Sequence, residues 1–253
     1  MNQVTKAKNT ELAENDLYGA LPTGLENVTA KDQSIPRITI LQGLSPQVNK
    51  NKLEYIKGAE TGDICETGTG SLYKELIFIP CFYARIFLEW APRESGKGLV
   101  MNHGTDDSIL KQCTKDEKGR PFTKDGNLVS ETMQFMILNM SADERFAFLP
   151  LSATNLKHGK SFVTKIMAQK IIRPDGSALQ APLFYRAWRM TIGSVSNNQG
   201  DWYAPRFEPS EKTLDLGGKE LLDKCVAFHN ACRDGLVRTE APVDEESADD
   251  KAM

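Results

Sequence analysis

The chain has 253 residues, 40% of them hydrophobic, and a formal net charge of −3. This length supports one substantial core, so we expect a single domain with extensions. The longest apolar run, LIFIPCFYARIFL, is interrupted by Pro80 and Arg85. It is shorter than the roughly 20 residues that a membrane-spanning helix needs, which argues against a membrane protein.

The charge is distributed unevenly along the chain. The last fourteen residues hold six acids and one lysine, a contribution of −5, so residues 1–239 carry +2. A mildly basic body beside an acidic end is typical of proteins that bind nucleic acid or a protein partner. Acidic termini also serve solubility alone, so the charge raises a nucleic-acid hypothesis without deciding it.

Cysteine usage indicates a reducing compartment. Five scattered cysteines include no CxxC pair, and the N-terminus shows no signal-peptide pattern. We therefore expect a cytoplasmic protein.

The first half of the chain predicts an arm followed by strands. Residues 1–34 are polar and predict a flexible N-terminal arm. IPRITILQGLSPQV predicts a short edge strand, and the four glycines of Gly58–Ser71 fit no phosphate-binding motif, so they predict turns. Lys74–Trp90 carries the strongest strand signal, and the charged segment Lys111–Asn127 predicts a hairpin excursion.

The second half adds strands, a helix between them and a final helix. Thr132–Met140 and Arg145–Leu151 predict strands, Ser152–Ile172 predicts a helix, and PLFYRAWRMTIGSV and WYAPRF predict two more strands. A further helix is expected near residues 218–234. This order predicts a mainly β fold with a few helices, an OB-fold-like β-barrel with insertions and flexible termini, over residues 35–238.

The C-terminal segment is expected to be a disordered acidic tail over residues 239–253. It has too little apolar surface to offset the entropy of ordering. Its carboxylates are Glu240, Asp244, Glu245, Glu246, Asp249 and Asp250.

Strand alternation predicts an aromatic and basic surface. From Leu76 the even positions are apolar, so the odd positions should present Tyr83, Arg85 and Phe87 to solvent. Such rings stack bases at about 1–3 kcal/mol each, while cations bind the phosphates between them. The expected stacking residues are Tyr83, Phe87, Tyr185, Trp202 and Tyr203. The alternative is that each ring packs under a loop or helix.

Phosphate contacts are expected from basic side chains on the same strands and on the first helix. The candidates are Arg85, Lys157, Lys160, Lys165, Arg189 and Arg206. These contacts would give salt-dependent affinity without sequence reading. The lysines could instead form only the solvated face of the helix.

No motif in the chain indicates catalysis. HExxH, GxSxG, Walker and zinc-deaminase motifs are absent, so we expect no enzyme and no cofactor. Asp106 with Asp107, or Glu208 with Glu211, leaves a two-metal nuclease site open. Cys225, His229 and Cys232 share one helical face, but that face is an apolar stripe without a fourth ligand. We expect no metal there, although zinc is left open.

These features together resemble the single-stranded DNA-binding proteins that tailed phages encode for their own replication. IPRITILQGLSPQV, followed by GAETGDI and the long strand, resembles the opening of such proteins. The resemblance implies an OB-fold that coats and protects single-stranded DNA, without sequence preference, during phage replication and recombination in the host cytoplasm. It also implies that the acidic tail shields the groove and contacts replication or recombination proteins. Tails of several such proteins end in an aromatic residue, whereas this chain ends in DDKAM.

Two other functions stay open at this point. The first is a metal-dependent nuclease or other DNA-processing enzyme, and the second is a protein-interaction or structural module. The sequence leaves a homodimer open as well, and predicts no membrane partner.

Overall fold

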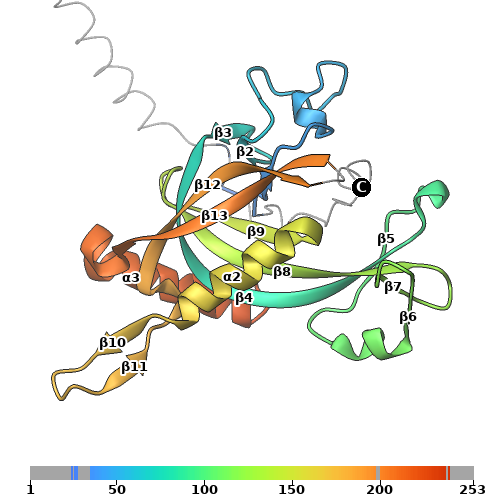
Figure 1. Cartoon of the computed structure of the whole chain (residues 1–253). Coiled ribbons are helices and arrows are strands. Elements are labelled where there is room, and N and C mark those ends of the chain that lie inside the picture. Colours follow the sequence, from blue (N-terminus) through green and yellow to red (C-terminus); the bar gives the residue numbers. More distant parts are fainter. Residues whose placement is uncertain (1–23, 25, 28–34, 198–199, 238, 240–253) are drawn as a thin grey trace, which may run out of the picture. The chain divides into compact units, whose positions relative to one another are not determined.

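The 16-residue strand β4 (Glu75–Trp90) lies at the centre of the structure. In this computed structural model, which describes residues 24, 26–27, 35–197, 200–237 and 239, β4 pairs with an antiparallel strand on either side. The other strands of this path are β8 (Leu128–Asn139), β9 (Arg145–Ser152), β12 (Arg186–Asn197) and β13 (Gly200–Lys212). Their spatial order is β9-β8-β4-β12-β13, and the sheet curls into a half-barrel (Figure 1).

The strand order confirms the predicted fold class. Helix α2 (Leu156–Met167) follows the third strand of this path and precedes the fourth, which is the element order of an OB-like fold. The chain divides into two units, residues 1–34 and 35–253, and the strands and helices of the described residues lie in the second. The predicted N-terminal arm, apart from Gly24, Glu26 and Asn27, and the acidic residues of the predicted tail lie outside the described residues.

Smaller elements decorate the half-barrel. β1 (Ile38–Ile40), β2 (Ile64–Glu66) and β3 (Ser71–Tyr73) form a separate three-stranded sheet. β5 (Leu99–Asn102), β6 (Thr114–Lys115) and β7 (Pro121–Phe122) gather at the far end of β4 and β8, as Figure 1 shows. β10 (Lys170–Ile172) and β11 (Ala178–Gln180) form a projecting hairpin. Short 3-10 turns lie at Pro46–Val48, Arg93–Ser95, Asp107–Gln112, Ala153–Asn155 and Leu183–Tyr185.

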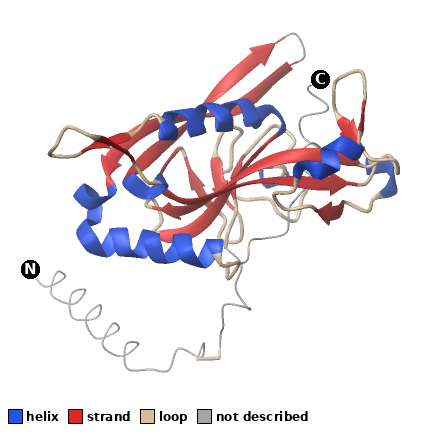
Figure 2. Ribbon diagram, turned by 90° about the horizontal axis from the view of Figure 1, so that it is seen from below, coloured by secondary structure: helices blue, strands red, loops and turns tan. Residues whose placement is uncertain are grey.

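The two helices cover opposite sides of the curled sheet (Figure 2). α2 inserts Phe162 and Ile166 into the core that also contains Phe78, Phe135 and Trp188. Gly159 lets this helix approach closely, since a Cβ there would lie 2.8 Å from the sulfur of Met133. The small residue is therefore a packing requirement of the α2 contact.

Helix α3 (Thr213–Arg233) buries Leu221, Cys225 and Phe228 against the other side of the sheet. It is longer than the predicted helix at 218–234 because it includes an additional first turn. The two parts meet at a break at Gly217 and Gly218, where Gly218 has a φ of 61°. No helix in the described part of the chain is long and apolar enough to cross a membrane.

A β-bulge at Cys81 reverses the side-chain alternation of β4. Pro80 pairs with Ile137 while Phe82 pairs with Met136, so Cys81 is the extra residue between two pairs. Before the bulge the even-numbered residues of β4 face α2, and after the bulge the odd-numbered residues face α2. The reason is that one inserted residue shifts the alternation by one position. The uninterrupted alternation expected from Leu76 to Trp90 is therefore wrong.

The far end of β4 is held by a half-buried polar network. The Glu89 carboxylate accepts a hydrogen bond from Asn127 Nδ2 at 2.7 Å and lies 2.9 Å from His103 Nε2. Burial raises the pKa of Glu89, but the hydrogen bonds from Asn127 and His103 outweigh it and lower that pKa below its ordinary value. This network joins the β5 loop and the start of β8 to the central strand.

A buried carboxylate joins the small sheet to the half-barrel. Glu66, at the end of β2, has 0% exposure. Its carboxylate accepts hydrogen bonds from Arg145 at 2.6 Å, Asn139 at 2.8 Å and Thr69 at 3.0 Å. Asn139 ends β8 and Arg145 begins β9, so one side chain connects three strands of two sheets.

This arrangement yields a stability prediction. Replacing Arg145 by Met should lower the free energy of unfolding by about 2 kcal/mol, because the buried Glu66 carboxylate loses its counter-charge. The loss should fall below the ~3–5 kcal/mol of wholly buried pairs, since Arg145 is half exposed to water. Urea unfolding followed by circular dichroism measures the change.

The control is Lys224→Met, which removes an ion pair with Glu144 that is part-exposed on both sides. It should change stability by at most about 0.5 kcal/mol. Equal losses in the two variants would contradict the structural role of the Glu66 carboxylate.

Candidate nucleic-acid interface

The first group of predicted stacking residues lies on β4, where the bulge changes the outcome. The Phe87 side chain is 1% exposed, so the prediction that it faces solvent is wrong. Tyr83 faces the core on the α2 side and its ring centroid lies 5.0 Å from that of Phe135. Burial raises the pKa of Tyr83. Both rings pack inside the protein, because the bulge at Cys81 turns these two odd-numbered side chains away from solvent.

Tyr203 is also held by neighbouring groups. Its backbone N–H donates to Gln42 Oε1 at 3.0 Å, and its carbonyl accepts from Gln42 Nε2 at 2.8 Å. The ring lies against Gly62, where a Cβ would come within 2.8 Å of it. Tyr203 therefore fastens β13 to the small sheet.

The sequence predicted that Tyr185 lies on a strand. It instead ends the 3-10 turn Leu183–Tyr185. This turn lies between Pro182 and the start of β12 at Arg186. Its half-buried ring has two cations close by, Arg186 at 5.8 Å and Lys212 at 5.9 Å from the centroid. Tyr185 thus belongs to a separate cationic corner at the beginning of β12.

Three of the predicted phosphate contacts have carboxylate neighbours. Arg85 lies 3.9 Å from both Asp107 and Glu131, and Lys160 lies 4.0 Å from Glu131. Arg189 lies 3.8 Å from Glu75. These long, partly exposed pairs contribute little to stability, but they place negative charge beside each cation.

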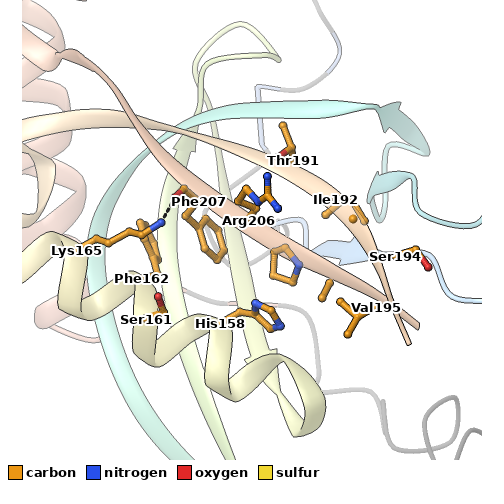
Figure 3. Close-up of a pocket in the computed structure, with 13 residues that line it drawn as sticks. His158, Ser161, Phe162, Lys165, Thr191, Ile192, Ser194, Val195, Arg206 and Phe207 are labelled. Atoms are coloured by element: carbon orange, nitrogen blue, oxygen red, sulfur yellow. Dashed lines mark hydrogen bonds between the residues drawn. The ribbon is translucent and has the colours of Figure 1, made fainter. Parts of the chain in front are cut away.

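Two of the remaining candidates, Lys165 and Arg206, line a cleft between α2 and the β12–β13 hairpin. The cleft holds a pocket of about 320 Å³, lined by His158, Ser161 and Lys165 from the helix and by both strands of the hairpin (Figure 3). Arg206 is an exposed residue of β13 in the same lining. Trp202 lies near the start of β13, and the Lys157 ammonium is 5.2 Å from the centroid of its ring. We call this region the α2–β13 cleft.

Helix periodicity explains how α2 supplies its side of the cleft. His158, Ser161 and Lys165 are spaced i, i+3 and i+7, which puts them on one helical face. Phe162 and Ile166 are buried beneath and fix the rotation of the helix. The Lys165 ammonium donates to the carbonyl of Phe207 at 2.6 Å, so it also holds α2 beside β13 (Figure 3).

The cleft is electrostatically positive. Among the described residues, the ionisable groups lining its pocket are His158, Lys165 and Arg206, and none is a carboxylate. Burial, followed by the charge of Lys157, lowers the pKa of His158. The lowered pKa favours the neutral form of His158, and the cations of this region are Lys157, Lys165 and Arg206.

Several lining residues were not predicted from the sequence. His158 stood outside every motif, and Ser161, Thr191 and Ser194 carried no signal on a single strand or helix. The spacing of His158, Ser161 and Lys165 on one helical face was a usable indication. The pairing of Thr191 with Arg206 across the hairpin could not be predicted, because the register of two strands depends on the fold.

The cysteine and histidine set on α3 lies in the core. Cys225 is fully buried and contacts the thiol of Cys81, which together with burial raises the pKa of Cys81. His229 Nδ1 lies 2.8 Å from the carbonyl oxygen of Cys81. Within the described ranges, no three His, Cys, Asp or Glu side chains gather where they could hold a metal ion.

A family model described as "Pam3 phage gp34-like protein" matches residues 5–238, which is most of the chain. No curated protein and no solved structure matches.

The electrostatics of the cleft predict a shift that can be measured. Replacing Lys157 by Gln should raise the pKa of His158, because a neighbouring positive charge that disfavours the imidazolium is removed. The pKa should stay below its ordinary value, since burial persists. An NMR titration of the His158 ring signals measures the change. Lys170→Gln, an exposed change on β10, is the control, and an unshifted pKa in Lys157→Gln would contradict the assignment.

Proposed function

The chain belongs to the Pam3 phage gp34-like family, and we propose that it is a non-catalytic, sequence-independent single-stranded DNA-binding protein. The observation that carries this proposal is the α2–β13 cleft. It has Lys165 and Arg206 in its pocket lining and Lys157 5.2 Å from the ring of Trp202, with no carboxylate among the described residues that line the pocket. Cations bind phosphates, and an aromatic ring stacks bases.

The kind of contact favours a single strand. Base stacking on Trp202 requires an unpaired base, because the faces of bases in a duplex are already stacked on one another. Ring faces and ammonium groups distinguish bases poorly, so the proposed binding does not depend on sequence. Coating of single strands during phage replication or recombination follows as the proposed role.

The cations of the cleft differ from those elsewhere on the surface. Within the described part of the chain, Lys157, Lys165 and Arg206 have no ion pair, whereas Arg85, Lys160 and Arg189 have carboxylates within 4.0 Å. A phosphate entering the cleft therefore displaces no carboxylate from these groups. This difference supports the cleft over the β4 surface as the site of binding.

The acidic residues 240–250 supply a competitor in the same proposal. Their carboxylates, with Lys251, give the last fourteen residues a charge of −5. We propose that this segment competes with DNA for the cleft and binds replication or recombination proteins when DNA displaces it. The opposite signs of segment and cleft support the competition.

A titration tests the proposed binding. The full chain should bind a 30-nucleotide oligo-dT strand and should bind the matching duplex weakly. Three phosphate contacts predict a roughly twentyfold loss of affinity between about 50 and 200 mM salt, because each adds about −0.7 to the slope for a single strand. The DNA should be recovered intact after incubation with magnesium. Equal affinity for the single strand and the duplex, or cleavage of either, would contradict the proposal.

Variants of the cleft locate the binding. Lys165→Gln should weaken binding and reduce the salt slope by about 0.7. Its matched control is Lys219→Gln, an exposed lysine on α3 paired with Asp223, which should leave the titration unchanged. Trp202→Leu should cost about 1–3 kcal/mol of binding. It should also abolish tryptophan quenching by DNA, because Trp90 and Trp188 are buried. Retained quenching would place the DNA elsewhere.

The competing segment has its own prediction. Removing residues 240–253 should raise the affinity for oligo-dT at low salt, and the gain should shrink as salt screens the charges. A full-length variant with the six carboxylates changed to amides should behave like the truncation. Unchanged affinity in both variants would exclude competition while leaving DNA binding intact.

A further inference from the structure

The pocket within the α2–β13 cleft has walls that a simple charged groove does not need. Apolar groups of Ile192, Val195, Ala204 and Pro205 line the hairpin side, and the edge of Phe162 lines the helix side. Its volume of about 320 Å³ is near the lower end of the range for ligand pockets, roughly 300–1,000 Å³. The pocket is therefore suited to one small group with an apolar face.

A buried polar atom adjoins these apolar walls. His158 Nε2 is buried and has no hydrogen-bond partner among the described residues. A buried polar atom without a partner is costly, so a ligand that supplies one gains a hydrogen bond. Ser161 from α2 and Thr191 and Ser194 from β12 add hydroxyl groups to the same lining.

A cation is available at the same place. The Lys165 ammonium uses one of its three N–H groups on the carbonyl of Phe207. Among the described residues the other two have no acceptor, so they can bind an anionic oxygen. The contact with Phe207 also fixes the position of the ammonium, which reduces the entropy lost when an anion binds.

We infer that this pocket holds a single nucleotide unit, with its phosphate on Lys165, its base against the wall formed by Ile192 and Pro205, and a hydrogen bond to His158 Nε2. This inference rests on the proposed function and deepens it: one nucleotide of a bound strand leaves the surface and enters the pocket. The unpartnered Nε2 of His158 suits this role, because a neutral imidazole can donate a hydrogen bond to a base or sugar, or accept one from it.

Calorimetric titration of the full chain with small probes tests the inference. The probes are thymidine monophosphate, thymidine and inorganic phosphate. The monophosphate should bind at least tenfold more tightly than either fragment, because only it fills the apolar wall and reaches Lys165 together. Equal affinity for the monophosphate and inorganic phosphate would overturn the inference and leave an unspecific anion site.

Two variants place the probe in the pocket. Ser161→Leu inserts an apolar side chain into the lining and should weaken binding of the monophosphate by about tenfold or more. The matched control is Thr164→Leu, on the same helix three residues away and outside the lining, which should bind normally. His158→Phe keeps the ring and removes the nitrogen, and should weaken binding by about tenfold. Thermal melting confirms that each variant folds.

The oligo-dT titration separates the two proposals. If the chain binds oligo-dT but not the monophosphate, the pocket inference fails and the proposed function stands. If it binds the monophosphate with the expected dependence on Ser161 but not oligo-dT, the nucleotide pocket stands and strand coating fails. Normal monophosphate binding in both Ser161→Leu and His158→Phe would overturn the pocket assignment.

Discussion

The buried carboxylate of Glu66 is the contact on which the position of the cleft depends. It holds the three-stranded sheet β1–β3 at the junction of β8 and β9 through Asn139 and Arg145. In the segment that joins β1 to β2, Gln42 makes two hydrogen bonds to the backbone of Tyr203, and Gly62 lies against the Tyr203 ring. β1 also lies against both β9 and β13. The small sheet thus fills the space between the two ends of the half-barrel and fixes the outer strand, β13.

The position of β13 determines the position of the cleft, because β13 forms part of its wall. Trp202 and Ala204 flank Tyr203, so the contacts that hold Tyr203 also set the hairpin side of the cleft. On the other side, Phe162 stacks on Phe207 with ring centroids 4.2 Å apart, and Lys165 donates to the Phe207 carbonyl. The α2–β13 cleft is therefore built from well-packed elements on both sides, as a preformed ligand site requires.

The distribution of charge gives the cleft its character. Arg85, Lys160 and Arg189 each lie beside a carboxylate, which partly cancels their fields. In the cleft no carboxylate is among the described residues that line the pocket, and the exposed face of α2 contributes Lys157 and Lys165. Positive charge beside apolar walls is the combination that nucleotide ligands match, because they carry an anion and a flat apolar group in one molecule.

The sequence by itself determined the OB-like order of strands and helices, since hydrophobic periodicity, turn residues and a terminal glycine mark elements locally. It also indicated Lys157, Lys165, Trp202 and Arg206 as candidate binding residues. It could not place Tyr83 and Phe87, because the bulge at Cys81 depends on pairing with β8 and not on residues of β4 alone. Only the tertiary structure decided which cations share a surface and that His158 belongs with them. The physical reason is that alternation and helical spacing are local, whereas register, bulges and the contact of α2 with β13 arise from packing between segments distant in the chain.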